Sequence, residues 1–197
     1  MIHDLSETLR AILTQPGLPP ELAGAHIVFD RPADTFNPTQ TTIDLFLYDL
    51  RENLEMRGSQ AASAPSTSGT PSTSGTASTS NSTVTQPALP LACTYLVTAW
   101  PVGGPELALQ EQRLLSEALQ VLTKYRTIPT QFLQGSLAGR LPLPQMLVLH
   151  PDALKNVSEF WTSLGNKLRP SLSVTVTLAM PSFQEAAITA ASSGVRP

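Results

Sequence analysis

The chain has 197 residues, a length that fits one domain of ordinary size with a short appendage. Only 14% of its residues are charged and the net charge is −3, so it has no basic excess with which to bind nucleic acid or an anionic membrane surface. A charge content this low is expected where an uncharged insert dilutes the charge, where much of the surface is buried against partners, or both.

The N-terminus and the cysteine content indicate the compartment. The opening residues MIHDLSETLR include acidic side chains and lack the basic start and apolar run of a signal peptide. No apolar stretch approaches the roughly 20 residues needed to cross a bilayer. Cys93 is the only cysteine and lies in an apolar run, which excludes an intrachain disulfide and indicates a small buried side chain. A protein made and kept in the cytosol is expected.

The first third of the chain predicts one helix and two strands. Apolar residues at helical spacing predict an amphipathic helix that ends before Pro16. A short strand is predicted at His26–Asp30 and a longer one at Thr42–Leu50. The longer strand alternates in period two, and the aromatic residues on its second face suggest partial cover on both sides.

Residues 58–86 form an uncharged insert of Ser, Thr, Gly, Ala and Pro, in which PSTSGT occurs twice in tandem. Such a segment has too little apolar surface to offset the entropy of ordering it, so we expect a disordered loop. It is either a linker between two domains or a long loop within one. The second interpretation is favoured, because residues 1–57 are too few to bury a core of their own.

The rest of the chain continues with three strands and two helices. The strands are predicted at Leu91–Trp100, Gln145–His150 and Leu172–Leu178, and the helices at Glu106–Lys124 and Ser158–Leu164. The first of these strands is apolar on both faces and is expected in the middle of the sheet, whereas the last has one apolar and one polar face. In the longer helix, Glu111 is assigned to the exposed side.

This order of elements predicts an α+β fold with a mixed, mainly antiparallel sheet and helices packed on one face. We expect a single domain over residues 1–180, interrupted by the loop at 58–86, and a loose C-terminal tail over residues 181–197.

The sequence shows no arrangement of residues that is typical of a catalytic site. The three histidines are scattered without partners at metal-ligand spacing, and neither a phosphate-binding glycine loop nor Gly-x-Ser-x-Gly occurs. We therefore expect no metal, no cofactor and no enzyme activity. A hydrolase that pairs Cys93 with His150 stays open as a minor alternative.

Several motifs carry a family resemblance. They are IHDLSETLRAIL at Ile2–Leu13, LFLYDLREN at Leu45–Asn53, PALPLACTYLVTAW at Pro87–Trp100, QRLLSEALQVL at Gln112–Leu122, FWTSL at Phe160–Leu164 and RPSLSVTVTL at Arg169–Leu178. On these residues the chain resembles the cap, or tail-terminator, proteins of contractile injection systems of the antifeeding prophage and Photorhabdus virulence cassette type. The signature residues are Tyr95, Leu96, Val97, Thr98, Ala99, Trp100, Leu114, Leu115 and Trp161.

The resemblance implies a structural role. A cap of this family forms a sixfold ring on the baseplate-distal end of the tube and sheath, ends their polymerisation and stabilises the extended sheath. The implied partners are the sheath protein, the inner-tube protein and further copies of the chain, without nucleic acid or membrane insertion. The protein would be cytoplasmic and assembled into the particle. Some family members continue after this domain, and no role of such an extension is carried over to a chain that stops at Pro197.

An alternative of a different class is an adaptor that tethers the particle or an effector through the segment at 58–86. For the cap, an open sheet edge could accept or donate a strand. The polar-faced strand Leu172–Leu178 and the short strand His26–Asp30 are the candidate edges. The proposed interface residues of the first are Leu172, Val174, Val176 and Leu178.

Overall fold

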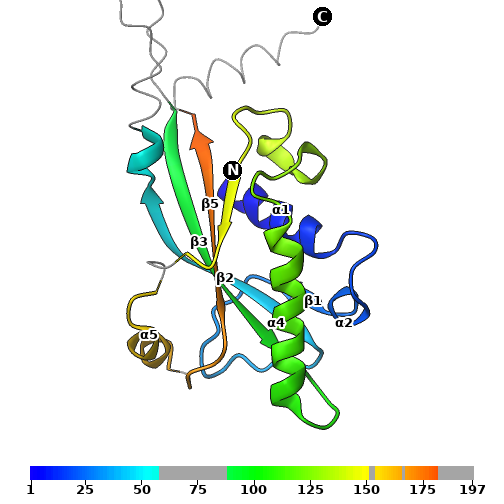
Figure 1. Cartoon of the computed structure of the whole chain (residues 1–197). Helices are drawn as coiled ribbons and strands as arrows, with labels where there is room; N and C mark the ends of the chain where they lie inside the picture. The colour runs from blue at the N-terminus through cyan, green and yellow to red at the C-terminus, as the bar shows by residue number, and fades with distance from the viewer. Residues whose placement is uncertain (58–87, 151–153, 166, 182–197) are drawn as a thin grey trace, which may run out of the picture.

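The computed structural model describes residues 1–57, 88–150, 154–165 and 167–181. Within these ranges the centre of the fold is a five-stranded sheet in the order β1-β2-β3-β5-β4 (Figure 1). Its strands are β1 (His26–Val28), β2 (Thr42–Glu52), β3 (Leu89–Trp100), β4 (Gln145–Val148) and β5 (Leu172–Met180). β1 runs parallel to β2, and every other neighbouring pair is antiparallel. The predicted mixed, mainly antiparallel sheet is therefore confirmed.

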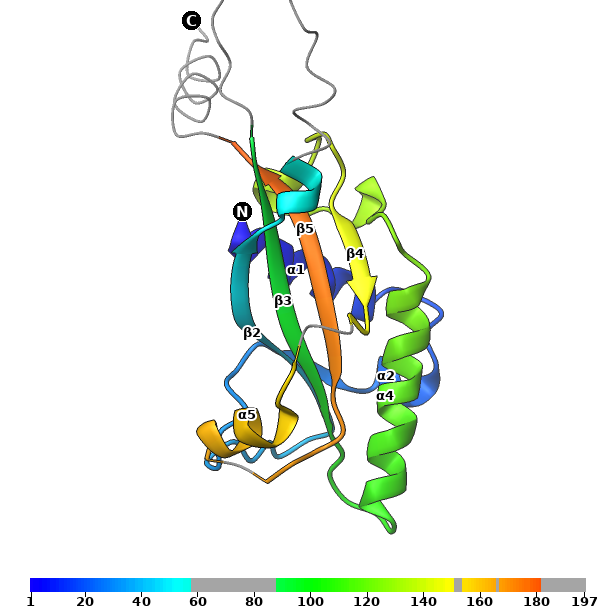
Figure 2. The same cartoon turned by 60° about the vertical axis from the view of Figure 1, so that its left-hand side comes forward.

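Helices cover both faces of this sheet. The elements are α1 (Ile2–Leu13), α2 (Pro20–Ala23), α4 (Leu107–Thr123), α5 (Val157–Ser163) and the short 3₁₀ turns η1 (Thr130–Phe132) and η2 (Gly135–Leu137). α1 and α4 lie on one face, whereas α5 lies on the other (Figures 1 and 2). The prediction of helices on one face holds for α1 and α4. α5 packs on the second face, where it contacts the aromatic side chains of β2.

The main core lies between the sheet and the two long helices. Apolar side chains recur on α1 and α4 at the three- and four-residue spacing that forms one stripe, and this stripe is buried. β3 supplies the middle of the sheet. Cys93, Tyr95 and Val97 point into the main core, and Leu96 points to the opposite face beneath α5. Because β3 is buried on both faces, its predicted central position is confirmed.

The ends of several elements differ from the prediction. β1 stops at Val28, because the backbone N–H of Asp30 donates to the side chain of Asp44 rather than to a backbone carbonyl. β2 continues to Glu52 through an irregularity between Leu47 and Asp49, and β5 continues to Met180. α5 ends in a way that is common for helices, because Gly165 just beyond it has a φ of 76°, a conformation that glycine adopts without strain.

Two predictions concern residues outside the described ranges. They are the disordered loop at 58–86 and, apart from Pro181, the tail at 181–197. Both remain predictions, as does the single-domain boundary that depends on them. In the described part of the chain, no helix combines the length and the apolar character that a membrane span requires.

Candidate functional site

The signature residues of β3 hold the interior together. Tyr95, Leu96, Val97, Thr98 and Ala99 all have 0% exposure. On α4, Leu114 and Leu115 pack into the main core, and Trp161 of α5 packs on Leu96 in a second, smaller cluster. These signature residues therefore pack between the sheet and the helices on its two faces. They do not form an accessible surface.

Trp100, the last signature residue, belongs to a polar and aromatic cluster at the end of β3. The guanidinium of Arg169 lies 3.7 Å from the centre of the Trp100 ring, and the ring of Phe36 meets the same indole edge-on at 4.9 Å. Arg169 also forms an ion pair with Glu111 of α4 at 3.0 Å and donates to the carbonyl oxygen of Ala99. This cluster fastens the N-terminal half of α4 to the end of the central strand.

The prediction that Glu111 is exposed was wrong, since its exposure is 9%. The signal was present in the spacing, because Glu111 lies three and four residues before Leu114 and Leu115 and therefore on their stripe. A charge is tolerated there because Arg169 pairs with it. The distance of 58 residues between the two partners hides that pairing from the sequence.

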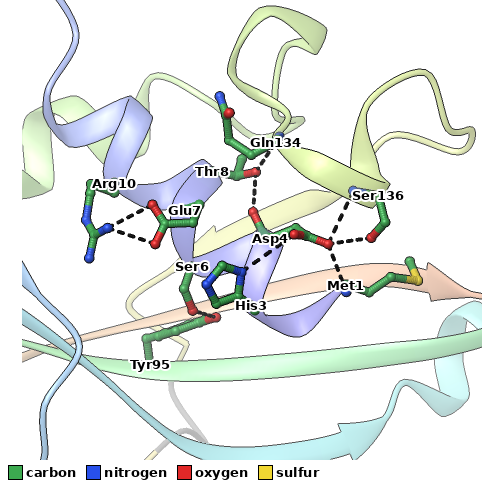
Figure 3. Close-up of polar contacts among 10 residues, drawn as sticks. All are labelled: Met1, His3, Asp4, Ser6, Glu7, Thr8, Arg10, Tyr95, Gln134 and Ser136. Atoms are coloured by element: carbon green, nitrogen blue, oxygen red, sulfur yellow. Dashed lines mark hydrogen bonds and ion pairs between the residues drawn. The ribbon is translucent and has the colours of Figure 1, made fainter.

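A second polar cluster joins the start of α1 to the segment around η2 (Figure 3). The carboxylate of Asp4 accepts hydrogen bonds from the backbone N–H and the hydroxyl of Ser136, and it lies 2.9 Å from the N-terminal amine. One turn later, the hydroxyl of Thr8 donates to the carbonyl oxygen of Asp4 and accepts from the N–H of Gln134. Gly135 between them has a φ of 52°, and a side chain there would collide with Asp4.

Tyr95 links the same helix to the sheet. Its hydroxyl lies 3.1 Å from the hydroxyl of Ser6, so the phenol has a polar partner at the boundary of the core. Burial raises the pKa of Tyr95 to about 12, so the phenol stays neutral at physiological pH. Together with the Asp4 cluster, this contact fixes the position of α1 over β3.

The Asp4 cluster predicts an acid-sensitive contribution to stability. Hydrogen bonds from Ser136, together with the N-terminal amine, hold the pKa of Asp4 well below its usual range. The contribution is therefore present above the ordinary carboxyl pKa of about 4 and is lost as the pH falls further. We expect Asp4→Asn to lower the free energy of unfolding by about 1 to 2 kcal/mol at neutral pH, measured by urea denaturation.

The matched control for this prediction is Glu7→Gln on the same helix. Glu7 forms an ion pair with Arg10 on the surface, and its loss is expected to cost less than about 0.5 kcal/mol. The difference in the free energy of unfolding between wild type and Asp4→Asn should become smaller as the pH falls into the acid range. A gap that stays constant down to about pH 3 would contradict the depressed pKa.

The two residues of the hydrolase alternative do not meet. Cys93 faces the main core with 0% exposure, and burial raises the pKa of its thiol to about 11. His150 lines a groove on the opposite face of the sheet together with Thr94 and Thr175. No cluster of His, Cys, Asp and Glu suited to a metal ion occurs among the described residues. The pairing proposed for a hydrolase is therefore wrong.

The predicted edge at Leu172–Leu178 is also wrong. β5 lies between β3 and β4 and pairs with both, so it is internal. Its residues Leu172, Val174, Val176 and Leu178 point toward the main core, and Val174 and Val176 have 0% exposure. The alternation correctly indicated a polar face, formed by Ser173, Thr175 and Thr177. A polar face does not imply a free edge, because a strand can be polar on one face and still pair along both of its sides.

The outer strands of the sheet are β1 and β4. The prediction that the strand beginning at His26 lies at an edge is confirmed. Each outer strand borders a groove. A groove of about 620 Å³ lies along β1, between the strand and the C-terminal half of α1. A second, of about 660 Å³, lies on the second face of the sheet and reaches β4. The outer side of β4 is partly occupied, because the N–H of Met146 donates to the carbonyl oxygen of Arg126.

Comparison with known proteins matches the chain to a family model and to solved structures, two of which are described below. The family model described as the Pvc16 N-terminal domain matches residues 4–192. The cryo-EM structure of the PVC sheath/tube terminator of an extracellular contractile injection system, in the extended state, is similar with a TM-score of 0.60 and 23% identity over 92% of this chain. The cryo-EM structure of the anti-feeding prophage cap, a tube-terminating cap, gives a TM-score of 0.58 and 23% identity over 92% of this chain.

The chain spans little more than half of these two relatives, namely 57% of the first and 55% of the second. No curated protein sequence matches it significantly. At this level of identity the two structures establish the α+β terminator fold for this chain.

Proposed function

Because the chain belongs to the Pvc16 N-terminal domain family, we propose that it is a structural tail terminator of a contractile injection system. It binds the baseplate-distal end of the tube and sheath, ends their polymerisation and stabilises the extended sheath. The observation that carries the proposal is the shared fold, which extends over 92% of the chain in both a sheath/tube terminator and a tube-terminating cap.

The physical task of a terminator explains why it needs no catalytic site. A tube or sheath grows by stacking identical rings head to tail, through a heterologous interface that does not close on itself. Growth stops when the last ring is covered by a protein that matches its symmetry and does not present the same face again. Stable packing and specific surfaces suffice for this. The contacts of Arg169 with Glu111 and Trp100 contribute to such packing, because they hold α4 against the end of β3.

The partners follow from this role. Copies of the chain associate as a sixfold ring, and the ring contacts the sheath protein and the inner-tube protein. The chain acts in the cytoplasm, within the assembling particle, and without binding nucleic acid or inserting into a membrane.

The test of this role is the position of the protein in purified particles. A tagged chain, labelled with gold and viewed by electron microscopy, is expected at one end of each particle, opposite the baseplate. A variant without residues 60–85 should still be found there. If the deletion abolishes association with particles while the protein stays folded, the chain is an adaptor that acts through this segment and not a terminator.

A further inference from the structure

The second face of the sheet is only partly covered by the described residues. α5 packs there on Leu96, toward the end of the face where β5 begins (Figure 2). Toward the other end of the same face lies the groove of about 660 Å³, whose floor is formed by three neighbouring strands. The floor residues are Ala92 and Thr94 of β3, Thr175 and Thr177 of β5, and Gln145 and Leu147 of β4.

The hydroxyl groups on this floor already have partners. The hydroxyls of Thr94 and Thr175 lie 3.2 Å apart, within hydrogen-bond distance. The side-chain amide of Asn53 donates to the hydroxyl of Thr177 at 3.1 Å. An occupant of the groove therefore does not need to supply hydrogen bonds to these three threonines, and an apolar surface can cover them without leaving their hydroxyls unpaired.

Two leucines add apolar surface to the groove. Leu147, on the floor, is 45% exposed, and Leu54, at the side, is 69% exposed. Of the charged residues at the same side, Arg51 is paired with Asp49 at 2.6 Å. The groove thus fits a surface of small and apolar side chains better than it fits a charged ligand.

The sequence that follows Pro181, at the end of β5, has an apolar stripe of this kind. Residues 182–193 include neither proline nor glycine. Their apolar side chains recur at the three- and four-residue spacing of an amphipathic helix. The stripe consists of Phe183, Ala186, Ala187, Ala190 and Ala191, and the opposite side of Glu185, Thr189 and Ser192. Alanine favours a helix, and its small side chain lets a helix approach a sheet closely.

The position and length of this segment match the groove. Thr177 lies three residues before Met180, the last residue of β5, so the groove begins about 10 Å from the end of the strand. A helix over residues 182–192 is about 16 Å long. If the chain turns back after Pro181, such a helix reaches over Thr177 toward Thr175.

The extent of the family match also supports this segment as the occupant. The model of the Pvc16 N-terminal domain continues to residue 192, well beyond the end of β5 at Met180. The insert at 58–86 is connected to the same end of the sheet, between β2 and β3. It is interrupted by prolines and glycines, and Val84 is its only large apolar residue. The insert therefore lacks the apolar stripe that the groove requires.

We propose that residues 182–192 turn back from the end of β5 as a helix and cover the groove on the second face of the sheet. Phe183 and Ala187 face the floor, and Glu185 and Thr189 face outward. This helix continues the cover that α5 begins, and it replaces the expectation of a loose tail for these residues. The groove then belongs to the interior of the domain, and the polar side of the helix forms the outer surface here.

A pair of cysteines tests the contact in the purified full chain. Cys93 is first replaced by alanine, and Thr175→Cys on the floor is combined with Ala187→Cys in the segment. The control combines Ala187→Cys with Gln112→Cys, because Gln112 is exposed on α4 on the opposite face. With a short bis-maleimide reagent we expect at least tenfold more intramolecular crosslink from the first pair, measured by mass spectrometry of peptides. Equal yields from the two pairs would overturn the proposal, and so would a crosslink that joins two copies.

A second pair of variants tests the orientation of the helix. Ala187→Glu places a charge against the groove floor, whereas Thr189→Glu places the same charge on the outer side. We expect Ala187→Glu to lower the Tm by about 3 °C or more and Thr189→Glu by less than about 1 °C. Hydrogen exchange should show protected amides within residues 183–192 in wild type and in Thr189→Glu, and loss of that protection in Ala187→Glu.

Unprotected amides throughout residues 183–192 of wild type would contradict the proposal, as would equal effects of the two glutamate variants. These measurements are made on the isolated protein, whereas the proposed function is tested on particles. A cap that is found at the particle end while its residues 183–192 exchange freely would leave the proposed function intact and refute only the covered groove.

Discussion

Replacing Trp161 with alanine is expected to lower the free energy of unfolding by about 3 to 5 kcal/mol. The indole has 1% exposure and joins α5 to the sheet through a small cluster in which only Leu96 and Leu164 are also buried. Partly buried aromatic side chains surround it, and Phe160 meets Tyr48 edge-on at 5.1 Å. Because so few buried side chains hold α5, loss of the indole removes much of the apolar contact between this helix and the sheet. The decrease in the free energy of unfolding is measured by urea denaturation.

The control for this substitution is Trp161→Phe. The indole N–H is buried without a hydrogen-bond partner among the described residues, so its removal costs no hydrogen bond and relieves an unsatisfied donor. Phenylalanine keeps an aromatic ring over Leu96, and we expect a loss below about 1.5 kcal/mol. Equal losses for alanine and phenylalanine would contradict the account, because they would assign the stabilisation to the indole N–H rather than to packing.

Replacing Asp44 with asparagine is expected to stabilise the protein by about 2 to 4 kcal/mol at pH 8. Asp44 has 0% exposure, and one carboxyl oxygen accepts from the N–H of Asp30, whereas the other has no partner among the described residues. Burial raises the pKa of Asp44 from 3.8 to about 8. The hydrogen bond from the N–H of Asp30 acts in the opposite direction, and the nearby charge of Asp30 adds to the increase. Asparagine keeps the acceptor and needs no proton.

The direction of the pH dependence follows from this raised pKa. Between about pH 4 and pH 8 the folded protein holds a proton on Asp44 that the unfolded chain has released, so stability falls as the pH rises. The contribution is complete below about pH 4 and is lost by about pH 8. The slope is at most about 1.4 kcal/mol per pH unit. Asp44→Asn should remove this slope in urea denaturation measured across the range.

Asp44→Ala serves as the control at this position. It removes the charge and also the acceptor for the N–H of Asp30, so it should destabilise the protein in acid, where asparagine is close to neutral. The account would be wrong if wild type and Asp44→Asn kept a constant difference from pH 4 to pH 8. That result would mean that Asp44 has the same pKa in the folded and unfolded states.

Local patterns predicted the elements and the middle of the sheet well. The stripe of α1, the length of α4 and the two-faced burial of β3 depend on residues close together in sequence, so periodicity and composition are enough to find them. The short elements α2, η1 and η2 span only three or four residues each, and such segments are too short to carry a period.

Features that depend on distant partners could not be read in the same way. β5 is internal because β4 pairs with the side of it that faces away from β3. The residues of β5 themselves do not indicate this pairing. The burial of Glu111 depends on Arg169, and that of Asp44 on the course of the chain after β1. The groove along β1 requires α1 to lie beside the strand. Candidate surfaces of this protein therefore emerge only from the assembled fold, whereas its family is marked by interior residues.

The most direct measurement of the central claim is the length of tubes and sheaths, viewed by electron microscopy, in particles from a strain that lacks this gene. A terminator predicts tubes and sheaths of uncontrolled and variable length, or sheaths that do not stay extended, with normal particles restored by the intact gene. Particles of normal, uniform length with a properly closed end in the deletion strain would contradict the account.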